Sequence, residues 1–112
     1  MLSFQSLDVY QRSIDFLALT VVITEEIPRG HADMADQLRR AATSIPLNIG
    51  EAQGRTGKAD KARCYAIARG SAMECAAVLD VCRTLKLVGE NKYLEAIGLL
   101  ERVTAMLTKM CL

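Results

Sequence analysis

Residues 44–56, SIPLNIGEAQGRT, are the part of the chain that comes nearest to a chemical motif. Gly50, Gly54, Arg55 and Thr56 approach the phosphate-binding loop G-x-x-x-x-G-K-[ST], whose backbone amides hold phosphate groups. The glycines are one residue too close together, and arginine stands in place of lysine. The segment also ends a helical pattern, whereas a phosphate loop follows a strand. The sequence therefore does not predict a nucleotide-binding loop here.

Carboxylates and hydroxyls are the next candidates for chemistry. Glu51 and Glu74 could face the interior of a helical bundle, but a di-iron site also needs Glu-x-x-His pairs, and the single histidine is His31. Ser44 and Ser71 have no histidine base nearby in a helical pattern, so neither is a good nucleophile. We expect no catalytic residue, no metal, no cofactor and no small-molecule substrate.

Three of the four cysteines are spaced for a helix interior. Cys64, Cys75 and Cys82 are 11 and 7 residues apart, which places them within about 20° of one line on a helix. Zinc ligands must converge on one point and usually show C-x-x-C-type spacing. The spacing therefore favours small core residues over a metal or redox site.

Apolar residues recur at helical spacing in four stretches, at about residues 7–27, 33–54, 58–86 and from 91 onward. No stretch alternates as a strand does. Four amphipathic helices joined by short breaks are typical of an antiparallel up-down-up-down bundle. At 112 residues the chain is expected to form a single all-α domain over 1–112.

The second stretch contains a proline within its apolar pattern. Leu38, Ile45 and Ile49 lie on one helical face, and that face continues in phase through Pro46. A proline costs an isolated helix about 3 kcal/mol because it removes a donor and clashes with the preceding turn. The unbroken phase nevertheless predicts one kinked helix that ends near Gly54.

The ends and the buried face of the other helices are also predicted from residue types. Ser6 and Thr56 are expected as N-caps, and Gly89 as the stop after the third helix. The expected buried seam of the first helix consists of Tyr10, Ile14, Leu17 and Val21.

Charge is unevenly distributed along the chain. The net charge is +1, but residues 37–71 contain seven basic and two acidic residues, a local charge of +5. Apolar residues make up 51% of the chain, more than in an average soluble protein, which suits a core that continues into a subunit interface. No signal peptide is evident, and the run FLALTVVI is too short to span a bilayer, so we expect a cytoplasmic protein without a membrane partner.

A polar stripe lies opposite the apolar face of the second helix. On a helical projection Arg40, Ser44, Asn48, Glu51 and Arg55 fall within about 80° of one another. The stripe is either a solvated face or a surface that meets another subunit or a polyanion. The small residues in and beside it favour contact.

Two segments of this region resemble a known bacterial family. QLRRAATSIPLNIGEAQGR followed by YAIARGSAMECAAVLDVC resembles the four-helix bundle proteins, also called 23S rRNA intervening-sequence proteins, over essentially the whole chain. The family order Ala-Glu-Gly is exchanged here to Gly50-Glu51-Ala52, and Cys75 replaces the leucine after the motif glutamate. The matching residues are Gln37, Arg39, Arg40, Ala41, Ser44, Ile45, Asn48, Ile49, Glu51, Gly54, Arg55, Ile67, Ala68, Gly70, Ser71 and Glu74.

The resemblance implies an antiparallel bundle that assembles into a ring, a homopentamer in related proteins. Distantly similar bundles include accessory proteins of diversity-generating retroelements, which bind nucleic acid. No catalytic residue carries over, because none is assigned in the family.

Two hypotheses about function follow. In the first, a non-enzymatic homo-oligomer, a pentamer as the resemblance implies, binds RNA or DNA through the exposed basic residues Arg55, Lys58, Lys61 and Arg63. In the second, the protein is a structural or interaction scaffold, in which a polar network fixes the helix register or the subunit interface. The network residues are Arg39, Arg40, Ser44, Asn48, Glu51, Arg55 and Glu74.

Overall fold

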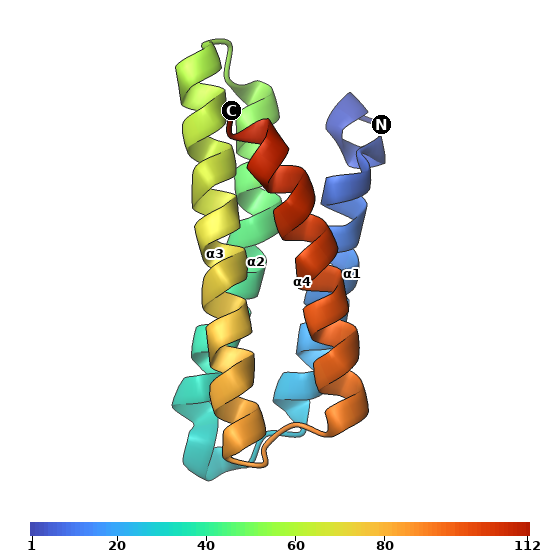
Figure 1. Ribbon diagram of the computed structural model, residues 1–112, viewed down its shortest axis with the longest axis vertical. Helices are drawn as coiled ribbons and strands as arrows, with labels where there is room; N and C mark the ends of the chain where they lie inside the picture. Colours follow the sequence, from blue (N-terminus) through green and yellow to red (C-terminus); the bar gives the residue numbers. More distant parts are fainter.

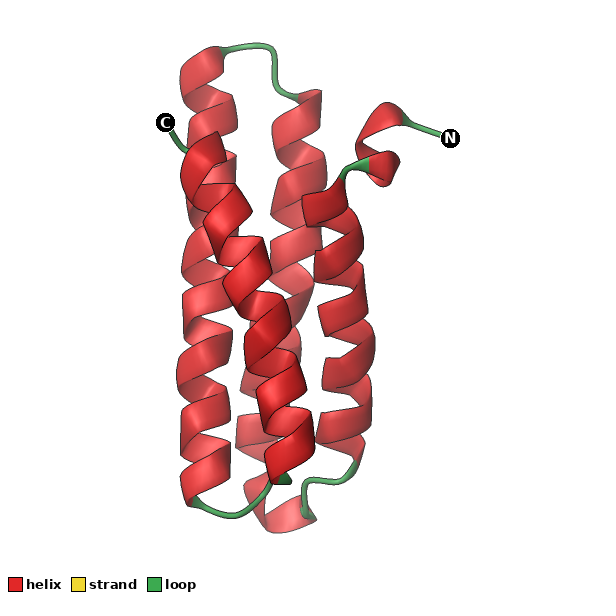
Figure 2. Ribbon diagram, turned by 45° about the vertical axis from the view of Figure 1, so that its right-hand side comes forward, coloured by secondary structure: helices red, strands yellow, loops and turns green.

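The computed structural model describes residues 1–112, and all of its regular structure is helical (Figures 1 and 2). Four long helices are joined by short connections. Two short 3-10 helices, η1 and η2, precede α1 and α2. The element bounds are η1 Ser3–Ser6, α1 Asp8–Glu25, η2 Arg29–His31, α2 Ala32–Gly54, α3 Lys58–Thr84 and α4 Glu90–Met110.

The helices form the predicted four-helix bundle. Each packs against its neighbour in sequence, and α4 closes the bundle against α1, giving a body of 44 × 22 × 21 Å. The α2–α3 turn and both chain termini lie at one end, and the α1–α2 and α3–α4 connections lie at the other (Figure 1). The α2–α3 turn forms the tip of the molecule, beyond both termini.

The predicted continuity of the second helix is confirmed. α2 runs from Ala32 to Gly54 with Pro46 inside it, and Pro46 itself is buried. Leu38, Ile45 and Ile49 are fully buried on the core side of this helix. Burial of a Leu or Ile side chain contributes about 1.5–3 kcal/mol, so the apolar face can offset the cost of the proline.

The predicted buried seam of the first helix is wrong by about one residue. Tyr10, Ile14 and Leu17 are only partly buried, and Val21 is 43% exposed. The face that enters the core carries Phe16 together with hydroxyl side chains. Its residues are Val9, Ser13, Phe16, Thr20, Ile23 and Thr24.

Two of the three buried hydroxyls of α1 bond to carbonyls of the helix itself, whereas Thr20 Oγ1 has no hydrogen-bond partner. Ser13 Oγ donates to the Tyr10 carbonyl at 2.6 Å, and Thr24 Oγ1 donates to the Thr20 carbonyl at 2.9 Å. Such local bonds remove much of the cost of burying a hydroxyl. The apolar stripe that the sequence suggested therefore lies beside the core and stays half-exposed.

The predicted N-caps are also wrong. Ser6 belongs to η1, where its hydroxyl donates to the Ser3 carbonyl at 2.9 Å, and Leu7 is the N-cap of α1. Gly57, not Thr56, is the N-cap of α3. Neither helix start has a side-chain capping bond.

The turn that terminates the third helix contains Lys86 in the position where the sequence predicted Gly89. The amide of Leu87 donates to the Cys82 carbonyl at 2.8 Å, and the amide of Lys86 donates to the Arg83 carbonyl at 3.0 Å. These are the two bonds of a Schellman motif, which places Lys86 in the left-handed region at φ 61°. Gly89 is instead the N-cap of α4, with φ −73°.

The prediction that three of the cysteines are small core residues is confirmed. Cys64, Cys75 and Cys82 are each fully buried in the main core cluster along α3. No group of three or more His, Cys, Asp or Glu side chains is placed to hold a metal ion.

Candidate functional site

Three side-chain hydrogen bonds fix the register of α2 against α3, one of them from Gln53 Nε2 to the Tyr65 hydroxyl. Ser71 Oγ donates to Ser44 Oγ at 2.8 Å, and the Cys64 thiol donates to Glu51 Oε2 at 3.3 Å. Because the two helices are antiparallel, these bonds set the height of every other residue along the pair.

The solvent side of this helix pair, which we name the outer α2/α3 face, mixes charged, small and apolar side chains. Leu47 is 66% exposed, and Ile67 and Val81 are 43% and 45% exposed. Beside it lies a shallow hollow of about 370 Å³, lined by Arg39, Arg40, Thr43, Ser44, Leu47 and Asn48. The face consists of Arg40, Ser44, Leu47, Asn48 and Glu51 of α2 and Ile67, Ser71, Glu74 and Val81 of α3.

The polar groups of this face do not form one connected network within the chain. Asn48 Nδ2 donates to the carbonyl and the hydroxyl of Ser44, at 2.8 and 3.0 Å. Glu51 forms a separate pair with Arg55 at 3.6 Å. Arg40 and Glu74, which the sequence hypothesis included in the network, have no hydrogen bond or ion pair through their side chains.

Arg39 also lines the hollow, but its side chain bonds toward α1. Its Nε donates to Thr24 Oγ1 of α1 at 2.9 Å, and its guanidinium lies 3.8 Å from Asp36. Arg39 therefore joins α1 to α2, while its neighbour Arg40 remains free on the α3 side. Helical spacing places Arg39 about 100° from Arg40, but its partner Thr24 on another helix could not be read from that spacing.

The four basic residues proposed for nucleic-acid binding surround the tip at the α2–α3 turn (Figure 1). Lys58, Lys61 and Arg63 form no ion pair, and Arg55 shares Glu51. Lys61 and Arg63 are two residues apart on α3, so they point about 160° apart. The cations therefore encircle the tip, and we name Arg55, Lys58, Lys61 and Arg63 the basic tip.

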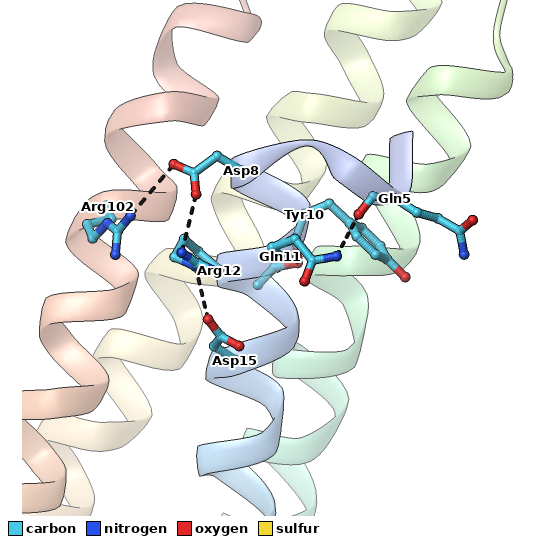
Figure 3. A network of polar contacts seen from close by, with 8 residues as sticks. Gln5, Asp8, Tyr10, Gln11, Arg12, Asp15 and Arg102 are labelled. Atoms are coloured by element: carbon cyan, nitrogen blue, oxygen red, sulfur yellow. Dashed lines mark hydrogen bonds and ion pairs between the residues drawn. The ribbon is translucent and has the colours of Figure 1, made fainter. Parts of the chain in front are cut away.

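A second group of charges ties α1 to α4 near the terminal end of the bundle (Figure 3). Arg12 lies 3.4 Å from Asp8 and 2.9 Å from Asp15, and Arg102 of α4 lies 3.6 Å from Asp8. The i,i+3 and i,i+4 spacing within α1 could have revealed the first two pairs. Arg102 is 94 residues further along, and nothing in the sequence assigns it to this group. These exposed charges position helices and form no recessed site.

A third polar group holds the α3–α4 connection. The Tyr93 hydroxyl donates to Asp80 Oδ1, and the Arg83 guanidinium lies 4.4 Å from the centre of the Tyr93 ring. Arg83 Nε also donates to Glu90 at 3.1 Å. The hydrogen bond to Asp80, followed by burial, raises the pKa of Tyr93. These contacts join the end of α3 to the start of α4 across the connection.

The nucleophilic side chains are arranged for packing. Burial raises the pKa of Cys75 to about 12, and burial with the hydrogen bond to Glu51 raises the pKa of Cys64. Thiols held in the protonated form are poor nucleophiles. The Ser44 and Ser71 hydroxyls bond to one another, and no histidine, lysine or carboxylate contacts them as a base.

The structure thus defines an all-helical bundle with a polar, partly apolar outer face and a basic tip. Residues 5–109 match the family of 23S rRNA-intervening sequence proteins, and the chain belongs to that family. The resemblance noted in the sequence is confirmed at this level. The likeness to retroelement accessory proteins stays an expectation.

A solved structure shares this fold. It is a protein of unknown function from the S23 ribosomal protein family of Bacteroides thetaiotaomicron, 22% identical in sequence, with a TM-score of 0.85. The match covers 92% of this chain and 97% of that one. No curated protein matches the chain. None of the helices is both long enough and apolar enough to cross a membrane.

Proposed function

We propose that this protein is a non-enzymatic, cytoplasmic homo-oligomer, a ring of five copies, that binds the phosphate backbone of RNA or DNA. The observation that carries the proposal is the basic tip. Three of its four cations have no acidic partner, and the tip projects beyond both termini, where a polymer can reach it.

The chemistry of the tip favours backbone contact over base reading. Lysine and arginine neutralise phosphates and release counterions, and this term is independent of sequence. No aromatic residue lies between Arg55 and Arg63 in the chain, and Tyr65, two residues after Arg63, is buried and bonded to Gln53. Base stacking of the kind used by single-strand binders therefore has no platform at the tip.

A ring amplifies this weak site. Cyclic symmetry repeats every surface in the same orientation along the axis, so five parallel copies present five basic tips on one side. Several weak phosphate sites on one rigid body raise the overall affinity through their effective concentration.

The second candidate is a scaffold without a nucleic-acid ligand. The observation that favours it is the outer α2/α3 face, where Leu47 is 66% exposed beside small polar residues. A half-apolar face with small side chains suits contact with another protein surface. In this case the face fixes the assembly, and the basic tip only keeps it soluble.

Binding of structured RNA and duplex DNA, measured by fluorescence anisotropy from 20 to 200 mM salt, tests the first candidate. Two double variants are compared with the wild type: Lys58→Glu with Lys61→Glu, and Arg55→Glu with Arg63→Glu. We expect each to weaken binding. We also expect each to reduce the slope of the logarithm of the binding constant against the logarithm of the salt concentration by about 2 per subunit. The matched control is Arg29→Glu with Lys86→Glu, which changes the charge equally at the opposite end. Absence of binding at the lowest salt, or equal loss in the control, rejects the nucleic-acid role and leaves the scaffold.

A further inference from the structure

Two unpartnered and opposite charges lie at the same height on the outer α2/α3 face. Arg40 is four residues, or about 6 Å, from Ser44 toward the start of α2. Glu74 is three residues, or about 4.5 Å, beyond Ser71 on α3, which runs the opposite way. Since Ser44 and Ser71 are bonded to one another, the two charges differ in height by only about 1.5 Å. Neither has a partner in its own chain.

The surroundings of these charges are those of a contact surface. Leu47 lies two turns above Arg40 on the same side of α2, and Val81 lies two turns below Glu74 on the same side of α3. Both are substantially exposed, at 66% and 45%. Between them lie Ser44, Ser71 and Gly70, whose small side chains let another helix approach closely.

We propose that the outer α2/α3 face is the contact between copies of this chain, and that Arg40 of one copy pairs with Glu74 of the next. This inference rests on the homo-oligomer in the proposed function and identifies its interface. The occupant is a second copy because the complement of each free charge is present on the same face, at the matching height.

The matching height brings the two charges level when the copies run parallel to one another. In a ring of parallel copies, α2 of one chain beside α3 of the next brings Arg40 level with Glu74. A two-fold axis parallel to the helices likewise sets α2 of one copy against α3 of the other and forms the pair twice. In these arrangements Leu47 lies level with Ile67 of the next copy, so both exposed apolar side chains are covered as well. One long side of a 44 × 22 Å body can supply the roughly 800 Å² per partner of a stable interface.

Charge reversal and charge exchange test the pair. The mass of each variant is measured by native mass spectrometry and by sedimentation over a range of protein concentrations. We expect the wild type to be oligomeric, and Arg40→Glu and Glu74→Arg each to raise the dissociation constant about tenfold or more, since each reversal sets like charges together. The exchange variant, Arg40→Glu with Glu74→Arg, restores most of the wild-type affinity.

The controls carry the same changes away from the face. Lys109→Glu and Glu101→Arg on α4 change exposed charges that have no ion pair, and they should leave the mass unaltered. Circular dichroism shows whether each variant is folded. Should a reversal unfold the chain, Arg40→Gln and Glu74→Gln remove the charges while keeping the side-chain shapes, and we expect each to weaken association a few-fold.

Three results overturn the inference, and they are distinguishable. A monomeric wild type rejects the homo-oligomer itself, and with it this interface. If the wild type is oligomeric and neither charge reversal changes the mass of the oligomer, the proposed interface is rejected but the homo-oligomer is not. Reversals that lower the melting temperature of the dilute monomer without changing association show that Arg40 and Glu74 pair within one chain.

Discussion

The hydroxyl of Ser71 donates a 2.8 Å hydrogen bond to the hydroxyl of Ser44, joining the middle of α3 to the middle of α2. Both side chains are half-buried and small, so the two helices come close together at this height. Ser44 Oγ also accepts from Asn48 at 3.0 Å, so it links one residue of its own helix and one of α3. The bond sets the register on which the proposed Arg40–Glu74 contact depends.

Ser71→Ala should lower the free energy of unfolding by about 1 kcal/mol, because one half-buried hydroxyl bond is lost. Ser44→Ala should cost more, since it leaves both Ser71 and Asn48 without this acceptor. Urea unfolding of the two single variants and the double variant measures the coupling, which we expect to be about 0.5–1 kcal/mol. Additive effects would show that the bond does not form in solution, and Thr104→Ala on the exposed side of α4 is the control.

Lys86→Gly should stabilise the protein by about 0.5–1 kcal/mol. Lys86 occupies the left-handed position of a Schellman motif at φ 61°, where glycine has no steric penalty. Thermal unfolding should show a higher Tm. The same substitution inside α3, Lys61→Gly, should instead lower stability by about 1 kcal/mol, and a loss at both positions would contradict the assigned motif.

Gly50→Ala should be stabilising, while Ala52→Gly should be destabilising. A Cβ at Gly50 would meet the Phe4 ring at 3.5 Å, an ordinary contact, and alanine is favoured over glycine in a helix by about 0.8–1 kcal/mol. Ala52 is fully buried, so its loss removes core packing as well as helix propensity. Denaturant unfolding of both variants checks these signs. Destabilisation by Gly50→Ala would mean that Phe4 packs more tightly on α2 than this distance indicates.

Tyr93 should make stability fall as the solution becomes alkaline. The pKa of Tyr93 is raised in the folded protein, chiefly by its hydrogen bond to Asp80, above the ordinary value of 10.0. Its contribution is therefore complete below pH 10 and is lost as pH rises through the folded pKa. The difference in Tm between the wild type and Tyr93→Phe, followed from pH 8 to pH 11.5, should shrink toward high pH. A constant difference would show that the hydroxyl does not titrate differently on folding.

The cysteines should separate into two classes on alkylation. Cys111 is partly exposed, whereas Cys64, Cys75 and Cys82 are buried, and burial raises their thiol pKa values. At pH 8 the native protein should take up one maleimide, at Cys111, and the unfolded protein four. Peptide mass mapping identifies the sites, and rapid native labelling of Cys75 would mean that the α3 core opens readily.

Much of the fold could be predicted from residue spacing. The three cysteines of α3 and the apolar residues on either side of Pro46 recur at helical intervals, and they occupy the core as expected. The first helix could not be treated in this way, because it has two adjacent apolar stripes. Ser13 and Thr20 enter the core where Ile14 and Val21 were expected, and of these two hydroxyls only that of Ser13 is hydrogen-bonded. A pattern based on side-chain polarity misses a hydroxyl that is bonded to its own helix.

The candidate site was only partly predictable for a related reason. Sequence spacing brought Ser44, Asn48 and Glu51 to one face of α2, as the structure does. It also joined Arg39 and Glu74 to them, although Arg39 bonds to Thr24 of α1 and Glu74 has no partner. Helical spacing specifies directions within one helix, and partners on other helices depend on how those helices pack.

The amino-acid sequence by itself determined the number of helices, the α3 cysteine stripe, the passage of α2 through Pro46 and the position of the basic segment, because these depend on short-range periodicity. Only the tertiary structure decided which stripe of α1 is buried, that Lys86 takes the left-handed position, and that Arg40 and Glu74 stand free at one height. Those features arise from the register between antiparallel helices. Side-chain volumes and hydrogen bonds far apart in the chain, such as Ser44 with Ser71, select that register.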